Sequence, residues 1–212
     1  NSLSRAAIYL GNQSEELILA QAGEETRFFH FQSGFLTAIS DGYDNRLRIS
    51  RDRSGRIQRL DNGAGRALLL RYERSHLVAI DYQQFRPAET LDQAWHTEQT
   101  LATYRYDERD HLIEATNAAG ESERYDYDEQ HVILQRQLTG GASFFWAWEK
   151  SGKAARCIRH WASFSQMDTR YVWDDEGSVT VTNVDGSEEV YVHDDRARLV
   201  RKVELDGGEH LK

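Results

Sequence analysis

Tyr106-Asp107-Glu108-Arg109-Asp110-His111-Leu112 and, 21 residues later, Tyr127-Asp128-Glu129-Gln130-His131-Val132-Ile133 are two copies of one sequence pattern. The pattern is an aromatic residue, an acid, two spacers, a small residue, a spacer and an aliphatic residue. Further copies begin at Trp173 and His193, weaker ones at Arg51, Tyr72 and Trp148, and a degenerate one at Phe31. From residue 51 onward the spacings are 21, 34, 21, 21, 25 and 20, and a period this regular indicates a repeat architecture.

Each repeat has the composition of a β-hairpin. Aromatic residues alternate before the acid, which places each pair on one face of a strand; the pairs are Tyr104 and Tyr106, Tyr125 and Tyr127, Trp146 and Trp148, Tyr171 and Trp173, and Tyr191 and His193. Asp and Gly at the intervening positions favour tight turns. The sequence therefore predicts an all-β fold of about eight units of roughly 21 residues, in which successive hairpins form a curved, spiralling antiparallel sheet.

Two regions are expected along the chain. Residues 1–28 contain short strands, such as Ala7–Leu10 and Glu16–Leu19, that continue the sheet, with a turn at Gly11–Asn12 between them. Residues 29–212 form the repeat array, with an insertion near residues 85–99 that explains the long 34-residue spacing. That insertion contains Pro87, the only proline, and the one segment that could begin a helix, because Pro is tolerated in a first helical turn.

Composition excludes several classes of protein. The 212 residues are 39% hydrophobic, which suits a folded chain, and no apolar run approaches the length of a membrane-spanning helix. The single Cys excludes an intrachain disulfide framework. The formal net charge of -9 disfavours general binding to nucleic acid, which needs a basic face. The chain begins at Asn1 without a signal peptide and is expected to be part of a longer polypeptide.

The candidate site residues are structural. We expect each acid of the repeat to begin a turn by binding backbone N–H groups. The repeat-motif residues are Asp52, Gly55, Tyr72, Tyr106, Asp107, Tyr127, Asp128, Trp148, Trp173, Asp174, Gly177 and Asp194. No catalytic residue, metal site or cofactor is predicted. Cys157 and His160 supply too few ligands for zinc, and no Gly-x-Ser-x-Gly nucleophile motif occurs.

Two tryptophans fall outside the repeat positions. Trp95 and Trp161 lie in the longer gaps between copies and are the candidates for contact with a ligand.

The pattern resembles the YD-repeat, or Rhs-repeat, family. The copies at Tyr106-Asp107, Tyr127-Asp128, Trp173-Asp174 with Gly177, and Arg51-Asp52 with Gly55 carry the resemblance, which covers about residues 29–206. The resemblance implies a β-strand spiral that closes into a hollow shell. In bacteria such a shell encloses a toxin domain made by the same polypeptide and exported by type VI or related secretion machinery. The family's Asp-Pro self-cleavage motif is absent, since Pro87 is the only proline.

The sequence thus leads to one main hypothesis and two alternatives. The main hypothesis is a non-enzymatic segment of an Rhs-type shell that encapsulates a C-terminal toxin domain for competition between bacteria. Its partners would be the rest of the shell, the toxin and secretion-spike or chaperone proteins. It would be made in the bacterial cytoplasm and exported, without inserting into a membrane itself. The alternatives are a carbohydrate- or cell-surface-binding module and an enzyme with paired carboxylates, although no credible pair can be named.

Overall fold

The computed structural model describes residues 6–88, 90, 94–150 and 154–205. Within these residues 18 strands make up the secondary-structure elements, and the strand pairings are antiparallel between neighbours in the chain, as in the pair β2 and β3. The predicted all-β fold is therefore confirmed. The chain divides into two compact units, Asn1–Tyr104 and Arg105–Lys212.

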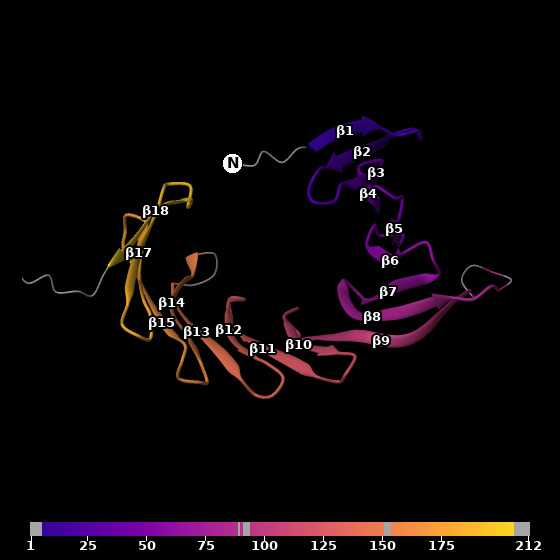
Figure 1. The fold of residues 1–212 in the computed structure, drawn as a ribbon. Helices are drawn as coiled ribbons and strands as arrows, with labels where there is room; N and C mark the ends of the chain where they lie inside the picture. The colour runs from indigo at the N-terminus through magenta and orange to yellow at the C-terminus, as the bar shows by residue number, and fades with distance from the viewer. Residues whose placement is uncertain (1–5, 89, 91–93, 151–153, 206–212) are drawn as a thin grey trace, which may run out of the picture. The chain divides into compact units, whose positions relative to one another are not determined.

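The first unit is an antiparallel meander (Figure 1). Its strands are β1 (Ala6–Leu10), β2 (Glu16–Gln21), β3 (Arg27–Gln32), β4 (Phe35–Asp41), β5 (Arg46–Arg51), β6 (Ile57–Asp61), β7 (Arg66–Glu73), β8 (His76–Phe85) and β9 (Trp95–Tyr106), whose last two residues belong to the second unit. The strands expected at Ala7–Leu10 and Glu16–Leu19 correspond to β1 and β2.

The second unit repeats the same arrangement. Its strands are β10 (Leu112–Asn117), β11 (Ser122–Tyr127), β12 (Ile133–Gln137), β13 (Ser143–Glu149), β14 (Arg156–Ala162), β15 (Asp168–Trp173), β16 (Ser178–Thr182), β17 (Glu188–His193) and β18 (Leu199–Leu205). Each hairpin of this unit corresponds to a repeat in the sequence, and the sheet is twisted and curved (Figure 1).

The insertion near residues 85–99 falls in the hairpin of β8 and β9. Its last residues, 95–99, belong to β9. The inserted sequence thus lengthens the hairpin of β8 and β9 to strands of 10 and 12 residues. In the connection, the Ala94 N–H donates to Thr90 O at 3.1 Å, the spacing of one helical turn, and most of the expected helix lies outside the described residues.

A β-bulge marks the beginning of most repeats. The pairing register shifts immediately before the first residue of the motif, at His30/Phe31, Ser50/Arg51, Arg71/Tyr72, Asp126/Tyr127, Ala147/Trp148 and Val192/His193. A bulge adds one residue to one strand and increases the local twist. Because the bulges recur at one motif position, each repeat bends its sheet in a similar way. The shift at Phe31 also identifies the degenerate copy as a structural repeat.

The described part of the sheet is a single layer. The buried residues are small or polar, namely Ala38, Ala67, Ala79, Ala94, Ala162, Val179, His30, Ser40, Asp81, Gln83, His111 and Ser143. Side chains are therefore covered by neighbours on the same face of the sheet instead of by a second layer.

Buried polar groups in the first unit are hydrogen-bonded across strands. Asp81, which is 3% exposed, accepts from Arg71 Nε and from Thr100 Oγ1, both at 2.7 Å. Gln83 on the same face accepts from Arg59 and donates to Thr97. Long Arg and Thr side chains thus satisfy the groups that an apolar core would leave unpaired.

The outermost strands of the described region expose apolar side chains, and we expect the isolated chain to associate through them. Ile8 and Leu10 in β1 are 72% and 85% exposed, and an exposed apolar strand invites pairing with another chain. The double variant Ile8→Lys/Leu10→Lys should therefore reduce association, measured by size-exclusion chromatography with light scattering. Tyr43→Lys, which replaces an exposed aromatic in a turn, should not. A wild-type chain that stays monomeric as its concentration rises would contradict the expectation.

Candidate functional site

The candidate site is the set of turns that begin at the acid of each repeat. In five turns the aspartate Oδ1 atom accepts the backbone N–H groups of the residues two and four positions later, at 2.8–3.0 Å. These aspartates are Asp52, Asp107, Asp128, Asp174 and Asp194. In each turn the aspartate N–H also donates to the carbonyl four residues later, at 2.9–3.1 Å. This is the geometry of a turn-forming aspartate, as the sequence predicts.

The third residue after each aspartate has a left-handed backbone. The φ angles are 81° at Gly55, 68° at Asp110, 66° at His131, 90° at Gly177 and 58° at Ala197. Glycine adopts this conformation without steric cost, and Asp and His tolerate it better than most other residues. The backbone at this position of the pattern is therefore left-handed whichever residue fills it.

The second carboxylate oxygen binds a side chain that the sequence pattern did not include. Oδ2 of Asp52 accepts from Arg56, and Oδ2 of Asp194 accepts from Arg198, each at 2.8 Å to Nε. In the Asp174 turn the partner is the Ser178 hydroxyl. The Arg198 side chain, and then its backbone amide, hold the pKa of the Asp194 carboxyl below its ordinary value. The spacing of four residues after the acid was the available signal for these partners.

In five repeats the first residue links its hairpin to the repeat before it. Its side chain reaches the backbone carbonyl 15 or 16 residues earlier. The pairs are Arg51 Nη2 to Leu36 O at 3.3 Å, Tyr72 Oη to Ile57 O at 2.8 Å, Trp148 Nε1 to Ile133 O at 2.7 Å, Trp173 Nε1 to Cys157 O at 2.7 Å, and His193 Nδ1 with Gly177 O at 3.2 Å. We call this contact the repeat link.

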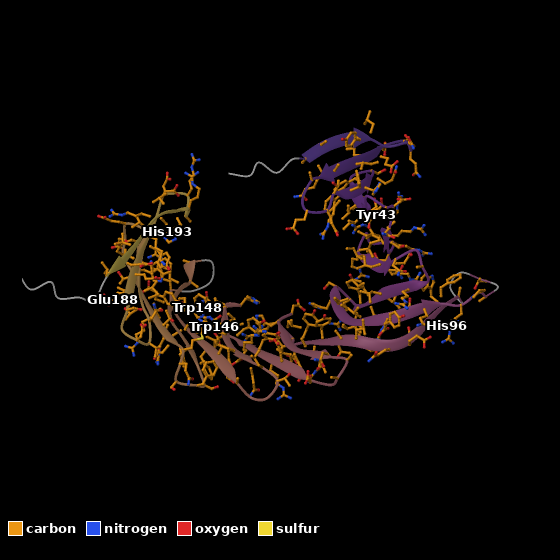
Figure 2. The ribbon with its side chains drawn as sticks, viewed as in Figure 1. Tyr43, His96, Trp146, Trp148, Glu188 and His193 are labelled. Carbon is orange, nitrogen blue, oxygen red and sulfur yellow. The ribbon has the colours of Figure 1, made fainter. Side chains whose placement is uncertain are left out.

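The repeat link explains why different residues occupy the first position. Tyr, Trp, His and Arg share a flat or extended side chain with a polar N–H or O–H at its far end. Arg51 therefore forms the link although it is not aromatic. Trp148 lies on β13 beside Trp146, and His193 ends β17 (Figure 2). The motif aromatics Tyr106 and Tyr127 end β9 and β11.

Ring contacts support the first residue of two repeats, Tyr72 and Tyr127. The Arg56 guanidinium lies over the Tyr72 ring at 4.4 Å, and the His111 ring stacks on Tyr127 with centroids 4.6 Å apart. In both cases the residue bound to the turn aspartate supports the aromatic residue of the next repeat. A cation over an aromatic face is attracted by the ring quadrupole, so the Arg56 contact adds to the hydrogen bond of Tyr72.

The two proposed ligand-contact residues have partners within the chain. Trp95 packs edge-on against Phe85 at 5.4 Å, and the Arg59 guanidinium lies 5.0 Å from its ring centre. Trp161 stacks on Phe145 at 5.4 Å and lies 4.6 Å from the Arg159 guanidinium. These contacts occupy surface that a sugar ring would need, and ligand binding at either residue stays a prediction.

The remaining candidates for reactive chemistry show the features of packed residues. Burial raises the pKa of the Cys157 thiol, which disfavours the reactive thiolate. Burial lowers the pKa of His160, whose ring stacks on Trp146 at 4.8 Å. Over the part of the chain that the structure describes, no group of three or more His, Cys, Asp or Glu is placed to hold a metal ion. The same residues include no helix of the length and apolarity that crossing a membrane requires.

Comparison with known proteins identifies relatives of part of this chain. Over 100 residues, 47% of the chain, the sequence is 33% identical to "Probable deoxyribonuclease RhsA" of Dickeya dadantii (strain 3937) and 31% identical to "Probable deoxyribonuclease RhsB" of the same organism. The match spans only 6% of the length of each of these curated relatives. No protein-family model matches the sequence.

Solved structures resemble the chain at low sequence identity. The crystal structure of TcdB2-TccC3-TEV covers 94% of this chain and 13% of its own, with a TM-score of 0.45 and 12% identity. A structure of the Photorhabdus luminescens Tc holotoxin pore covers 87% of this chain and 12% of its own, with a TM-score of 0.41 and 13% identity.

The left-handed position gives a prediction in two directions. Gly177→Ala should destabilise the fold by about 1 kcal/mol, because a side chain at φ 90° is strained and its Cβ would lie 3.3 Å from His193 O. Ala197→Gly, at the same motif position with φ 58°, should stabilise by about 0.5–1 kcal/mol. Urea denaturation of both variants measures the two changes. If both substitutions changed the free energy of unfolding in the same direction, the two turns would not share one backbone requirement.

The repeat link gives a second prediction. Trp148→Phe removes the N–H that binds Ile133 O, and should destabilise by about 1 kcal/mol more than Trp146→Phe. Both substitutions shorten a ring on β13, but Trp146 stacks on His160 through its ring face, which Phe retains. Denaturation midpoints measured at one temperature give the difference. A Trp146→Phe variant as destabilised as Trp148→Phe would argue against the hydrogen bond as the source.

Proposed function

We propose that this chain, which belongs to the Rhs/YD-repeat family, forms part of the wall of an Rhs-type β-shell that encapsulates a C-terminal toxin domain. The observation that carries the proposal is the repeat link, which recurs in both compact units at the same motif position. In these five repeats the hairpin is fixed to the one before it. Each added repeat therefore extends the sheet by one hairpin, and a long array of such repeats can form the wall of a shell.

The single-layer sheet supports the same role. Among the described residues the buried side chains are small or polar, and no large side chain is fully buried. An enzyme of this mass usually has a cavity enclosed by two packed layers. A shell wall needs the opposite, namely a thin sheet that separates two spaces. We therefore assign no catalytic step to this segment.

The remaining parts of the proposal concern the longer polypeptide. We propose that it is made in the bacterial cytoplasm and exported by type VI-like machinery for competition between bacteria. The partners of this segment would be the neighbouring repeats of the shell, the enclosed toxin domain, and secretion-spike or chaperone proteins. A carbohydrate- or cell-surface-binding role is less supported, because Trp95 and Trp161 are engaged by Arg59 and Arg159.

The natural full-length polypeptide gives the direct test. We expect electron microscopy to show a hollow particle and limited proteolysis to leave a C-terminal domain uncut. The double variant Trp148→Ala/Trp173→Ala, which removes two repeat links, should expose that domain to protease. Trp95→Ala/Trp161→Ala should leave it protected, and serves as the matched control because it also removes two tryptophans.

Other outcomes would refute this function. A polypeptide that forms a compact particle without an interior would exclude a shell. A C-terminal domain that is digested equally fast in the wild-type protein and the link variant would exclude encapsulation. Binding of the wild-type chain to a glycan array, lost in Trp95→Ala/Trp161→Ala, would favour the binding module instead.

A further inference from the structure

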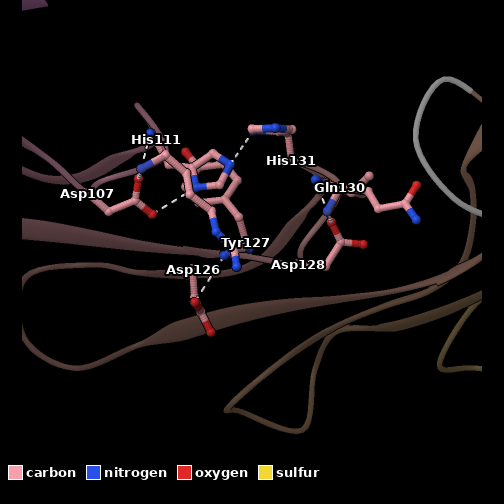
Figure 3. Close-up of polar contacts among 9 residues, drawn as sticks. Asp107, His111, Asp126, Tyr127, Asp128, Gln130 and His131 are labelled. Carbon is pink, nitrogen blue, oxygen red and sulfur yellow. Dashed lines mark hydrogen bonds and ion pairs between the residues drawn. The ribbon is translucent and has the colours of Figure 1, made fainter.

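Two histidines from successive turns form a hydrogen bond in the second unit. His111 Nε2 lies 2.5 Å from His131 Nδ1, and His111 Nδ1 lies 2.8 Å from Asp107 Oδ2 (Figure 3). The two rings meet edge to face, with centroids 4.5 Å apart. A chain of hydrogen bonds therefore runs from the Asp107 carboxylate through His111 to His131 and joins two neighbouring repeats.

Several contacts fix the His111 ring in this series of hydrogen bonds. His111 is 8% exposed, and its ring stacks on Tyr127. Asp107 also binds the Arg109 and His111 amides. The backbone amide of His111 is the largest cause that lowers the pKa of the Asp107 carboxyl, and the His111 ring adds to it against the opposing effect of burial. Asp107 is therefore an anion that accepts the proton on His111 Nδ1.

The other charged groups nearby belong to the two turns. Asp128 begins the turn that contains His131, and its carboxylate binds the Gln130 and Val132 amides. Asp126 binds the Tyr127 amide. Glu108, Asp110 and Glu129 are exposed turn acids. The two turns thus contribute several acids and one cation, Arg109, and Tyr127 stacks on the His111 ring.

The number of protons on the two histidine rings decides whether the hydrogen bond between them can form. With Asp107 accepting from His111 Nδ1, the His111 Nε2 lone pair accepts the N–H on His131 Nδ1. One added proton goes to the free nitrogen of His131 and leaves this hydrogen bond in place. A second added proton occupies His111 Nε2, so two N–H groups and two positive charges then face each other at 2.5 Å.

We infer that the His111–His131 hydrogen bond is a pH-sensitive contact between two successive repeats. It is formed at neutral pH and broken in acid. Histidine is the side chain whose charge changes between about pH 5 and pH 8. The Asp107 carboxyl, whose pKa is lowered by the backbone amide and ring of His111, stays ionised as the histidines gain protons. Loss of this hydrogen bond separates His131 from the stacked rings of His111 and Tyr127. It weakens the contact between these two repeats and no other.

This pH-sensitive contact is specific to this pair of repeats. The position of His111, four residues after the turn aspartate, is occupied by Arg56, Val132, Ser178 and Arg198 in other turns. Arg56 and Arg198 bind their aspartates as permanent cations. A change of pH between about 8 and 5 therefore acts on the His111 turn and leaves the Arg–Asp ion pairs of those turns intact.

Ring-nitrogen NMR of the 212-residue chain, titrated from pH 8 to pH 5, tests the inference. Because one proton satisfies the pair and a second opens it, the ring-nitrogen signals should show two protonation steps, and the His111–His131 hydrogen bond should be lost in the second. Hydrogen exchange, corrected for its intrinsic pH dependence, should speed up at residues 128–132 during the lower step. The turn of residues 52–56 should show no such change.

Two variants make the test decisive. His111→Arg should keep the ion pair with Asp107 and the contact with Tyr127, as Arg56 does in its repeat, and should abolish the acid-dependent exchange. His131→Asn, which suits the backbone at φ 66°, should leave His111 with a single titration step. Coincident titration of the two wild-type histidines would overturn the inference. So would acid-dependent exchange that persists in His111→Arg.

Discussion

The fold depends on one recurring constraint, the binding of backbone amides by a turn aspartate and the fixing of that turn to its neighbour. The carboxylate accepts two N–H groups that a tight turn would leave without partners, and so sets where each hairpin reverses. The link from the first residue of the motif then reaches the carbonyl of the preceding repeat. Together these contacts set the period, because a repeat of very different length would place the donor away from its acceptor.

A sheet built in this way is stabilised without a thick core. The buried residues are small or polar, and groups such as Asp81 are satisfied by side chains from adjacent strands. Hydrogen bonds and stacked rings between neighbouring strands take the place of packing between layers. This explains a composition rich in arginine and aromatic residues, and it explains why a bulge can recur at each repeat without disrupting a second layer.

Equivalent positions in the repeats share a geometry and differ in chemistry. Four residues after the turn aspartate, Arg56 is a fixed cation, Ser178 is neutral, and His111 changes charge with pH. The backbone around each is the same, so the properties of the array can vary locally while its architecture is kept. His111 and His131 illustrate this, because each fills an ordinary repeat position and only their proximity gives them a property of their own.

The sequence alone determined the period, the all-β class, the positions of the turns and the role of residues such as Asp107 and Gly177, because these follow from local rules of turn and strand chemistry. It also indicated the aromatic pairs such as Tyr125 and Tyr127. The tertiary structure decided what the local rules cannot reach. The bulge before each motif, the extension of β9 through residues 95–99 and the repeat link of Trp148 arise from pairing between strands. His111 and His131 lie 20 residues apart in the sequence, and only the pairing of successive hairpins brings their nitrogens within hydrogen-bonding distance.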